Sequence, residues 1–504
     1  MERRDFFKKA ALGVGLFACG EACMTMTGLS TLSGKCNNEL SVREAAYRVN
    51  NRQHGRQERV LPILPCNPAI QIFMDRCRRC GRCVDFCRNT MTVFGQSIPQ
   101  GETPCIYCGQ CTLLCSRAIT EQYHYHAVAD AIADNDKIVI ATTAPAIRVA
   151  LGEMYKLAPG TNVESKIVGS LKQLGVDHVL DTTFAADLTI MEEASELLQR
   201  LNPSPTPLTM EKESNDSKNL PMFTSCCPAW VRFAQLFYPN LLTNLSTAKS
   251  PVMMQGAMIK TYFAQKKRID PTKIFHFAIT PCTAKKAEIL FPGMNGAGIS
   301  FGKPEKQDVD VALTCRELAY LLNESNVDFL QAQDVEYSSL MGTGSGAGII
   351  FGNTGGVMEA ILRTAYKLLN DKNPPANFFD LQQVRNWDSV RQANIDLGKL
   401  SLNVAVVHGI GKIRPFIEEI IKGTQKYDFI EVMACTGGCI GGGGQPVPNI
   451  NATSLRQQRM NALYQRDTDM EIRLSYDNPQ IKAIYDEFLD KPLSEKSKEL
   501  LHRK

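Results

Sequence analysis

Eight cysteines fall in two short runs near the start of the chain, and they restrict the fold more than any other feature. The run from Cys77 to Cys87 has the pattern C-x2-C-x2-C-x3-C, and the run from Cys105 to Cys115 repeats it. Three thiolates this close together hold one face of an iron–sulfur cube, and a fourth must come from elsewhere. Zinc is the alternative, but zinc sites favour two separated C-x2-C pairs. The spacing therefore predicts iron–sulfur clusters.

The paired runs resemble those of bacterial two-cluster ferredoxins, in which the fourth cysteine of each run binds the other cluster. Arg88 and Ser116 replace the proline that usually follows each run, which affects the local turn but not the ligands. Residues 71–125 are expected to form a ferredoxin-like α+β domain that relays electrons through two accessory 4Fe–4S clusters. The expected ligands are Cys77, Cys80, Cys83 and Cys115 for one cluster, and Cys105, Cys108, Cys111 and Cys87 for the other.

The first 35 residues predict an export signal. A charged stretch, MERRDFFKK, precedes a short apolar stretch, which is the order of a signal peptide. Arg3 and Arg4 resemble a twin-arginine signal, which exports folded proteins already loaded with cofactors. We therefore expect a periplasmic protein, or a cytoplasmic one if the signal does not function. Residues 36–70 lack periodicity and are expected to form an irregular lead-in.

Residues 136–450 are expected to form a large α/β catalytic domain. A chain of 504 residues exceeds one ordinary core, and a net charge of +4 does not favour nucleic acid as a partner. KIVIATTAPAIRVAL predicts a buried strand running into a helix, and VDHVLDTTFAADLTIMEEASELLQRL repeats this order. Such alternation predicts mostly parallel sheets, with ligand sites at the carboxyl ends of the strands. Asn202 to Lys218 is predicted to be a surface loop that divides the domain into two lobes.

Three stretches of this region place cysteines at predicted strand or loop ends: TSCCPAW, TPCTAKKAE and EVMACTGGCIGGGGQP. Glycines let a backbone approach a bulky inorganic group. Four of the thiols could surround another 4Fe–4S cluster: Cys227, Cys282, Cys435 and Cys439. Cys226 is left over. It is either a thiol that exchanges protons beside the metal or a buried structural thiol.

Together, the three stretches resemble the catalytic domain of FeFe-hydrogenases. Further similar stretches are APAIRVALGE, DTTFAADLTIMEE, NLSTAKSP and FGNTGGVMEA, so the resemblance extends almost to the C-terminus. It implies reversible oxidation of dihydrogen and reduction of protons at an H-cluster. In this cofactor a 4Fe–4S cubane is joined to a two-iron subsite carrying carbon monoxide, cyanide and a bridging dithiolate. The resemblance makes Cys439 the bridge between the two parts.

The resemblance also implies contacts around the two-iron subsite. Lys285 would donate a hydrogen bond to one cyanide, and Ser250 with the backbone near Pro251 would serve the other. Phe351, Gly352 and Met433 would line an apolar pocket. Two positions depart from the family, which usually has Met in place of Thr280 and Pro in place of Thr436. Both departures indicate a tuned or divergent site, with Thr280 adding a hydroxyl beside the subsite.

A proton relay is implied in the order Cys226, Glu193, Ser246, Glu196 and Arg200. Spacing supports part of it, since Glu193, Glu196 and Arg200 lie at i, i+3 and i+7 on one face of a helix. The alternative is an ordinary surface face of ion pairs. Glu288 is expected to orient a nearby basic residue.

Residues 451–504 are charged and helical in pattern, and resemble the small subunit of periplasmic two-chain hydrogenases. This segment is expected to wrap the catalytic domain and to add no ligands. The expected partners are dihydrogen, protons, maturation proteins and an external electron carrier, either a periplasmic cytochrome or a ferredoxin, with the enzyme as a monomer. Two alternatives remain: a hydrogen-sensing hydrogenase of low turnover, and a non-catalytic iron–sulfur assembly protein, which would lack the Cys226–Cys227 pair.

Overall fold

The computed structural model describes residues 59–61, 63–99, 102–201, 219–447 and 452–503. The predicted export signal and the predicted loop from Asn202 to Lys218 lie outside these ranges. Within them, every helix is too short or too polar to cross a lipid bilayer.

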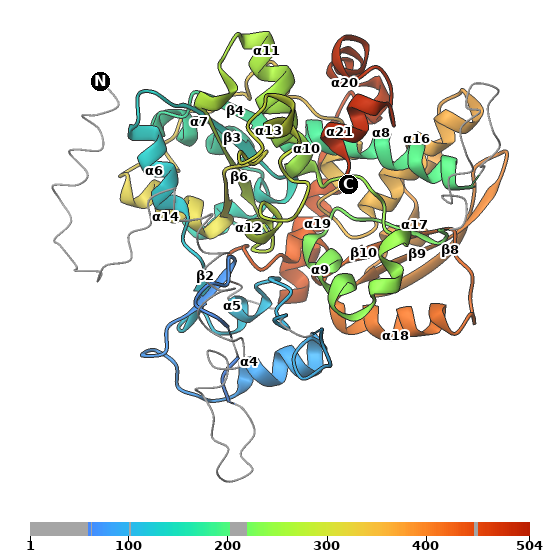
Figure 1. Cartoon of the computed structure of the whole chain (residues 1–504), viewed down its shortest axis with the longest axis horizontal. Helices are drawn as coiled ribbons and strands as arrows, with labels where there is room; N and C mark the ends of the chain where they lie inside the picture. The colour runs from blue at the N-terminus through green and yellow to red at the C-terminus, as the bar shows by residue number, and fades with distance from the viewer. Residues whose placement is uncertain (1–58, 62, 100–101, 202–218, 448–451, 504) are drawn as a thin grey trace.

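The segment with the two cysteine runs lies at one end of the molecule, drawn in blue in Figure 1. Strand β1 (Ile70–Ile72) pairs antiparallel with β2 (Ile119–Glu121). Two short helices follow glycines with positive φ angles: α4 (Arg82–Asp85) begins after Gly81, and α5 (Gln110–Leu114) begins after Gly109. Five cysteines of the two runs pack in a small core with Val84 and Ile119: Cys83, Cys87, Cys105, Cys111 and Cys115. This segment contains both helices and strands, as expected for it.

The first lobe of the larger region is built on a fully parallel sheet. Its strands lie in the order β4 (His178–Asp181), β3 (Ile138–Thr143), β6 (Ile274–Thr280) and β7 (Val311–Thr314). All residues of β6 are buried, in keeping with its mostly apolar sequence, IFHFAIT. The prediction of a helix directly after β3 is wrong. Two 3-10 segments, Pro145–Ile147 and Leu151–Tyr155, replace it, and Arg148 between them forms an ion pair with Asp181 at 2.8 Å.

The second lobe has a sheet in the order β5 (Met222–Phe223), β10 (Phe429–Met433), β9 (Ser401–His408) and β8 (Val390–Asp396). The first three strands are parallel, and β8 pairs antiparallel with β9 at the edge. Strand β8 was not expected from the sequence, because its residues are mostly polar and partly exposed. The two sheets confirm an α/β fold with mostly parallel strands.

Helix α8 (Thr182–Leu201) lies between the two lobes, and 16 of its 20 residues are buried. One side of α8 contributes Ile190 and Leu197 to one hydrophobic core, and the other contributes Leu188 and Met191 to a second. Helices α10 (Pro251–Met258) and α16 (Gly356–Asn370) pack on it. Polar side chains on such a helix must find buried partners, and these partners define much of the site below.

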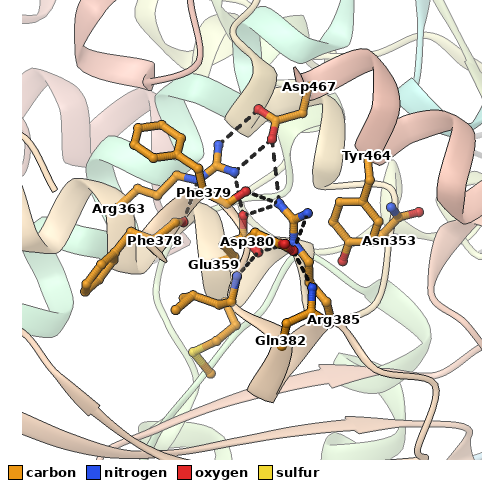
Figure 2. Close-up of polar contacts among 12 residues, drawn as sticks. Asn353, Glu359, Arg363, Phe378, Phe379, Asp380, Gln382, Arg385, Tyr464 and Asp467 are labelled. Carbon is orange, nitrogen blue, oxygen red and sulfur yellow. Dashed lines mark hydrogen bonds and ion pairs between the residues drawn. The ribbon is translucent and has the colours of Figure 1, made fainter. Parts of the chain in front are cut away.

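The C-terminal segment is helical, as expected. It contains α19 (Ala452–Asp469), α20 (Pro479–Ile484) and α21 (Glu495–Leu501). Figure 2 shows how it is anchored: Asp467 accepts a hydrogen bond from Arg363 of α16 at 2.9 Å. Within the segment, Asp467 also accepts a hydrogen bond from Arg473 at 2.6 Å. Arg363 also pairs with Glu359 at 2.5 Å. The segment is therefore joined to the catalytic domain through buried ion pairs.

Candidate active site

Four cysteines meet at the carboxyl ends of parallel strands from both lobes. Cys227 follows β5, Cys282 follows β6, and Cys435 and Cys439 follow β10. This is the edge at which α/β sheets place their ligands. All four line one pocket together with Cys226. The structure therefore brings together residues that lie more than two hundred positions apart in the chain.

The same pocket is lined by most of the side chains expected to surround a two-iron group: Lys285, Pro251, Thr280, Phe351, Gly352 and Met433. Ser250 is not among the lining residues. Its hydroxyl donates to Glu288 at 3.0 Å, so its hydrogen is used by that carboxylate.

The arrangement of the four thiols fits an iron–sulfur cluster better than a single metal ion. Burial and, after it, neighbouring thiolates raise the pKa of Cys282 to about 12 and the pKa of Cys435 well above its usual value. Thiolates so close together need a cationic group between them. Within the described ranges, no three His, Cys, Asp or Glu side chains converge on a single-ion site. In a cubane each thiolate binds its own iron, so a wider spacing of ligands fits.

The glycines of the loop after β10 are required by protein backbone rather than by the pocket. A Cβ atom on Gly442 would lie 2.2 Å from the Pro281 carbonyl oxygen, and one on Gly443 would lie 2.3 Å from the Cys108 carbonyl oxygen. Gly438 has a φ of 88°. The interpretation that these glycines leave room for the metal group is therefore incomplete. They let the loop pack against β6 and against the second cysteine run.

Lys285 points into the pocket from a buried ion pair. Its ammonium donates to Glu288 at 2.6 Å and to the Cys226 carbonyl at 3.3 Å. Burial opposes the charge of Lys285, but Glu288 raises its pKa above the usual value. An ammonium has three donor hydrogens. One therefore remains for a ligand in the pocket, and Glu288 has the orienting role expected of it.

Glu193, Glu196 and Arg200 share one face of α8, as their spacing predicts, and all three are buried. An exposed face of ion pairs is therefore excluded. Glu196 accepts from Arg200 at 2.6 Å and from the Ser246 hydroxyl at 2.9 Å. Neither carboxylate oxygen of Glu193 has a hydrogen-bond partner in the described chain. Burial, followed by the charge of Glu196, raises the pKa of Glu193 to about 8, which suits proton exchange near neutral pH.

Comparison with known proteins decides the family. Residues 137–443 match the family model of the iron only hydrogenase large subunit, C-terminal domain, and residues 453–504 match that of the iron hydrogenase small subunit. The chain belongs to the iron-only hydrogenases. Relatives in this family include the NADP-reducing hydrogenase subunit HndD of Solidesulfovibrio fructosivorans, which is 39% identical over 93% of this chain and 80% of its own length.

Another relative, iron hydrogenase 1 of Clostridium pasteurianum, is 37% identical over 86% of this chain and 75% of its own length. Among solved structures, a variant of apo [FeFe]-hydrogenase HydA1 from Chlamydomonas reinhardtii matches with a TM-score of 0.64 and 37% identity. That match covers 76% of this chain and 98% of the other. More distant relatives include cytosolic iron–sulfur assembly component 3 of Mus musculus, at 29% identity over 79% of this chain and 82% of its own length.

In this hydrogenase, Thr280 does not offer the pocket a free hydroxyl hydrogen. Its Oγ1 lies 3.0 Å from the Cys282 carbonyl oxygen and 3.4 Å from that of Leu313, so it donates within the end of β6. The expected extra hydrogen bond to a metal ligand therefore has no donor at Thr280.

Sequence reasoning missed Gln110, which joins the two halves of the hydrogenase. Its side-chain amide donates to the Cys435 sulfur at 3.2 Å and to the Gly441 carbonyl at 2.9 Å. Gln110 stands between Cys108 and Cys111 in the second cysteine run. A polar residue between two cysteines carries no signal for a partner 325 positions away, so the sequence could not have revealed this contact.

Proposed function

We propose that the protein interconverts dihydrogen with protons and electrons, as an FeFe-hydrogenase. The observation that carries the proposal is the meeting of four cysteine thiols from both lobes at one pocket, with Cys226 beside them. The proposed ligands of the cubane are Cys227, Cys282, Cys435 and Cys439, with Cys439 also bridging to the two-iron subsite. When bound, the H-cluster supplies the metal centre at which dihydrogen is formed or split.

Side chains of the protein would hold the H-cluster in place and shield it from water. Lys285 would offer its remaining hydrogen to one anionic ligand of the bound group, and a backbone amide near Pro251 would serve a second one. Phe351, Gly352 and Met433 give the pocket an apolar lining that keeps water away from the reacting atoms.

Protons move between the pocket and solvent through buried groups of the chain. Cys226 lies at the pocket, where burial raises its pKa and keeps the thiol protonated. Glu193 has free carboxylate oxygens and a pKa of about 8, so it can accept and release a proton near neutral pH. Ser246 and Glu196 are hydrogen-bonded to each other at 2.9 Å, and Arg200 holds Glu196 in place. This arrangement supports the relay order Cys226, Glu193, Ser246, Glu196 and Arg200.

Electrons leave through two accessory 4Fe–4S clusters in residues 71–125. One observation supports the proposal that the fourth cysteine of each run binds the cluster of the other run. Burial raises the pKa of Cys83, and the thiolates of Cys115 and Cys77 lie close enough to raise it further. Similarly, burial and then Cys105 raise the pKa of Cys87 to about 12. An external ferredoxin, or a periplasmic cytochrome if the N-terminus directs export, would accept the electrons.

The test begins with protein matured with its two-iron subsite. Hydrogen uptake is measured with a dye as electron acceptor, and infrared spectra are recorded for the bands of iron-bound carbonyl and cyanide. We expect both, and Cys226→Ser should lose at least about 90% of the turnover while keeping the bands, since it removes one relay step. Cys315→Ser, at a buried cysteine outside the pocket lining, is the matched control. Bands without turnover in the parent protein would favour a hydrogen sensor, and absence of the bands would favour an assembly protein.

A further inference from the structure

The end of the chain pairs with residues 246–250, the stretch that contains the relay serine. His502 forms an antiparallel bridge with Ala248. The amide of Arg503 donates to the Thr247 carbonyl at 2.7 Å. The small-subunit-like segment therefore reaches the interior of the catalytic domain next to the proton relay.

The guanidinium of Arg503 binds the relay directly. Its Nη2 donates to the Ser246 carbonyl at 2.7 Å, while the Ser246 hydroxyl donates to Glu196 at 2.9 Å. On the other side, Arg200 donates to Glu196 at 2.6 Å and to the Leu245 carbonyl at 2.8 Å. Two guanidiniums, one from α8 and one from the chain end, therefore hold the same short stretch and its carboxylate partner.

A buried carboxylate fixes the position of the chain end. His502 lies 2.8 Å from the Thr247 hydroxyl through Nδ1 and 3.0 Å from Glu192 through Nε2. Glu192 also accepts hydrogen bonds from three other groups of the C-terminal segment: the Tyr485 hydroxyl, the Ser497 hydroxyl and the Leu493 amide. Since Glu192 has no exposed surface, this contact is a stable anchor.

The chain end also forms one wall of a cleft. Glu196 and Arg200 lie on one side, and Lys498, His502 and Arg503 lie on the other, around a space of about 560 Å³. Lys498 is exposed at the rim. The cleft therefore joins the outer members of the relay to solvent.

We propose that Arg503 is a positioning residue of the proton relay. It holds Ser246 through the Ser246 carbonyl and places a positive charge near the carboxylates of Glu193 and Glu196. This inference rests on the proposed hydrogenase function. The charge acts on Glu193: burial and Glu196 raise its pKa, and Arg503 opposes that rise. The titratable groups around Arg503 are Glu193, Glu196, Arg200, Cys226, Glu288, Glu495, Lys498, Glu499 and His502.

The test compares Arg503→Gln, which removes the charge, with Arg503→Lys, which keeps it. Lys482→Gln removes an exposed positive charge elsewhere in the same segment and is the matched control. In matured protein, Arg503→Gln should move the pH profile of hydrogen uptake upward by about one unit, because Glu193 then binds its proton more tightly. The solvent isotope effect should increase, while Arg503→Lys and Lys482→Gln should match the parent. An unchanged pH profile and isotope effect in Arg503→Gln would overturn the proposal.

A second measurement needs neither metal nor turnover. In cluster-free protein, a chain ending after Leu501 should take up deuterium faster in peptides covering residues 245–250 than the full chain does, because the bridge to Ala248 is lost. Equal uptake would also overturn the positioning role. If the matured parent protein shows no hydrogen turnover, the proposed function fails, whereas the exchange result still decides whether the chain end holds this stretch.

Discussion

The amide of Gln110 donates a hydrogen bond to the sulfur of Cys435 across 3.2 Å. One residue belongs to the cysteine runs that we expect to carry electrons, and the other to the loop that we expect to bind the catalytic cubane. Hydrogen bonds to cluster sulfurs raise the reduction potential, because they stabilise the more negative reduced state. Gln110 therefore lies where it can adjust the potential of the proposed cubane relative to that of the proposed accessory clusters.

We predict that Gln110→Leu lowers the potential of the cubane by roughly 20–60 mV, the equivalent of one lost hydrogen bond. A redox titration followed by electron paramagnetic resonance would measure it. Gln71→Leu removes an amide of the same segment whose partner is the Glu121 carbonyl, and it should leave the potential unchanged. Equal potentials in Gln110→Leu and the parent would show that the contact has no electronic effect.

We predict that Glu193→Gln changes how the stability of the cluster-free protein depends on pH. The pKa of Glu193 is about 8 in the folded state and 4.5 in its reference state, so the folded protein binds the extra proton between these values. Stability therefore falls as pH rises through this window, by about 1.4 kcal/mol per unit for one proton. The variant should gain stability relative to the parent as the pH rises through the same window.

Guanidinium unfolding at several pH values would measure this difference. Glu305→Gln, at an exposed position, should show the pH dependence of the parent. A constant difference between Glu193→Gln and the parent across the range would mean that Glu193 does not titrate there.

We predict that Asp467→Ala destabilises the protein by about 3–5 kcal/mol, because it leaves the buried guanidinium of Arg363 without one of its two carboxylate partners (Figure 2). Asp469→Ala, two residues further on and exposed, should cost under about 0.5 kcal/mol. Denaturant unfolding of both variants is the measurement. A similar small cost for both would show that this ion-pair cluster is not the anchor of the C-terminal segment.

We predict that Gly442→Ala reduces the iron bound after cluster reconstitution to less than about half of the parent value, because its Cβ would lie 2.2 Å from the Pro281 carbonyl oxygen and displace Cys439. Iron analysis of the reconstituted protein would measure it. Gly302→Asn is the control, since open space surrounds that glycine and Asn tolerates its φ of 75°. Full iron loading of Gly442→Ala would show that the loop can move without losing its ligands.

The sequence predicts the elements whose signals are local. The strand before Cys435 follows from the alternating pattern of YDFIEVMA, and the face formed by Glu193, Glu196 and Arg200 follows from helical spacing. The contacts that complete the site are not local. Gln110 reaches Cys435 from a distant part of the chain, and Glu192 looks like any acidic residue on a helix although it is fully buried. Their partners are set by tertiary packing, which no short pattern encodes.

Two neighbouring acidic residues of α8 serve two different parts of the molecule. Glu192 binds the C-terminal segment, while Glu193 lies beside the groups of the proposed relay. The docking of the segment and the surroundings of the relay are therefore coupled through consecutive residues of one helix. If the segment detached from Glu192, every proposed metal ligand would remain, but the cleft beside Glu196 and Arg200 would lose one of its walls.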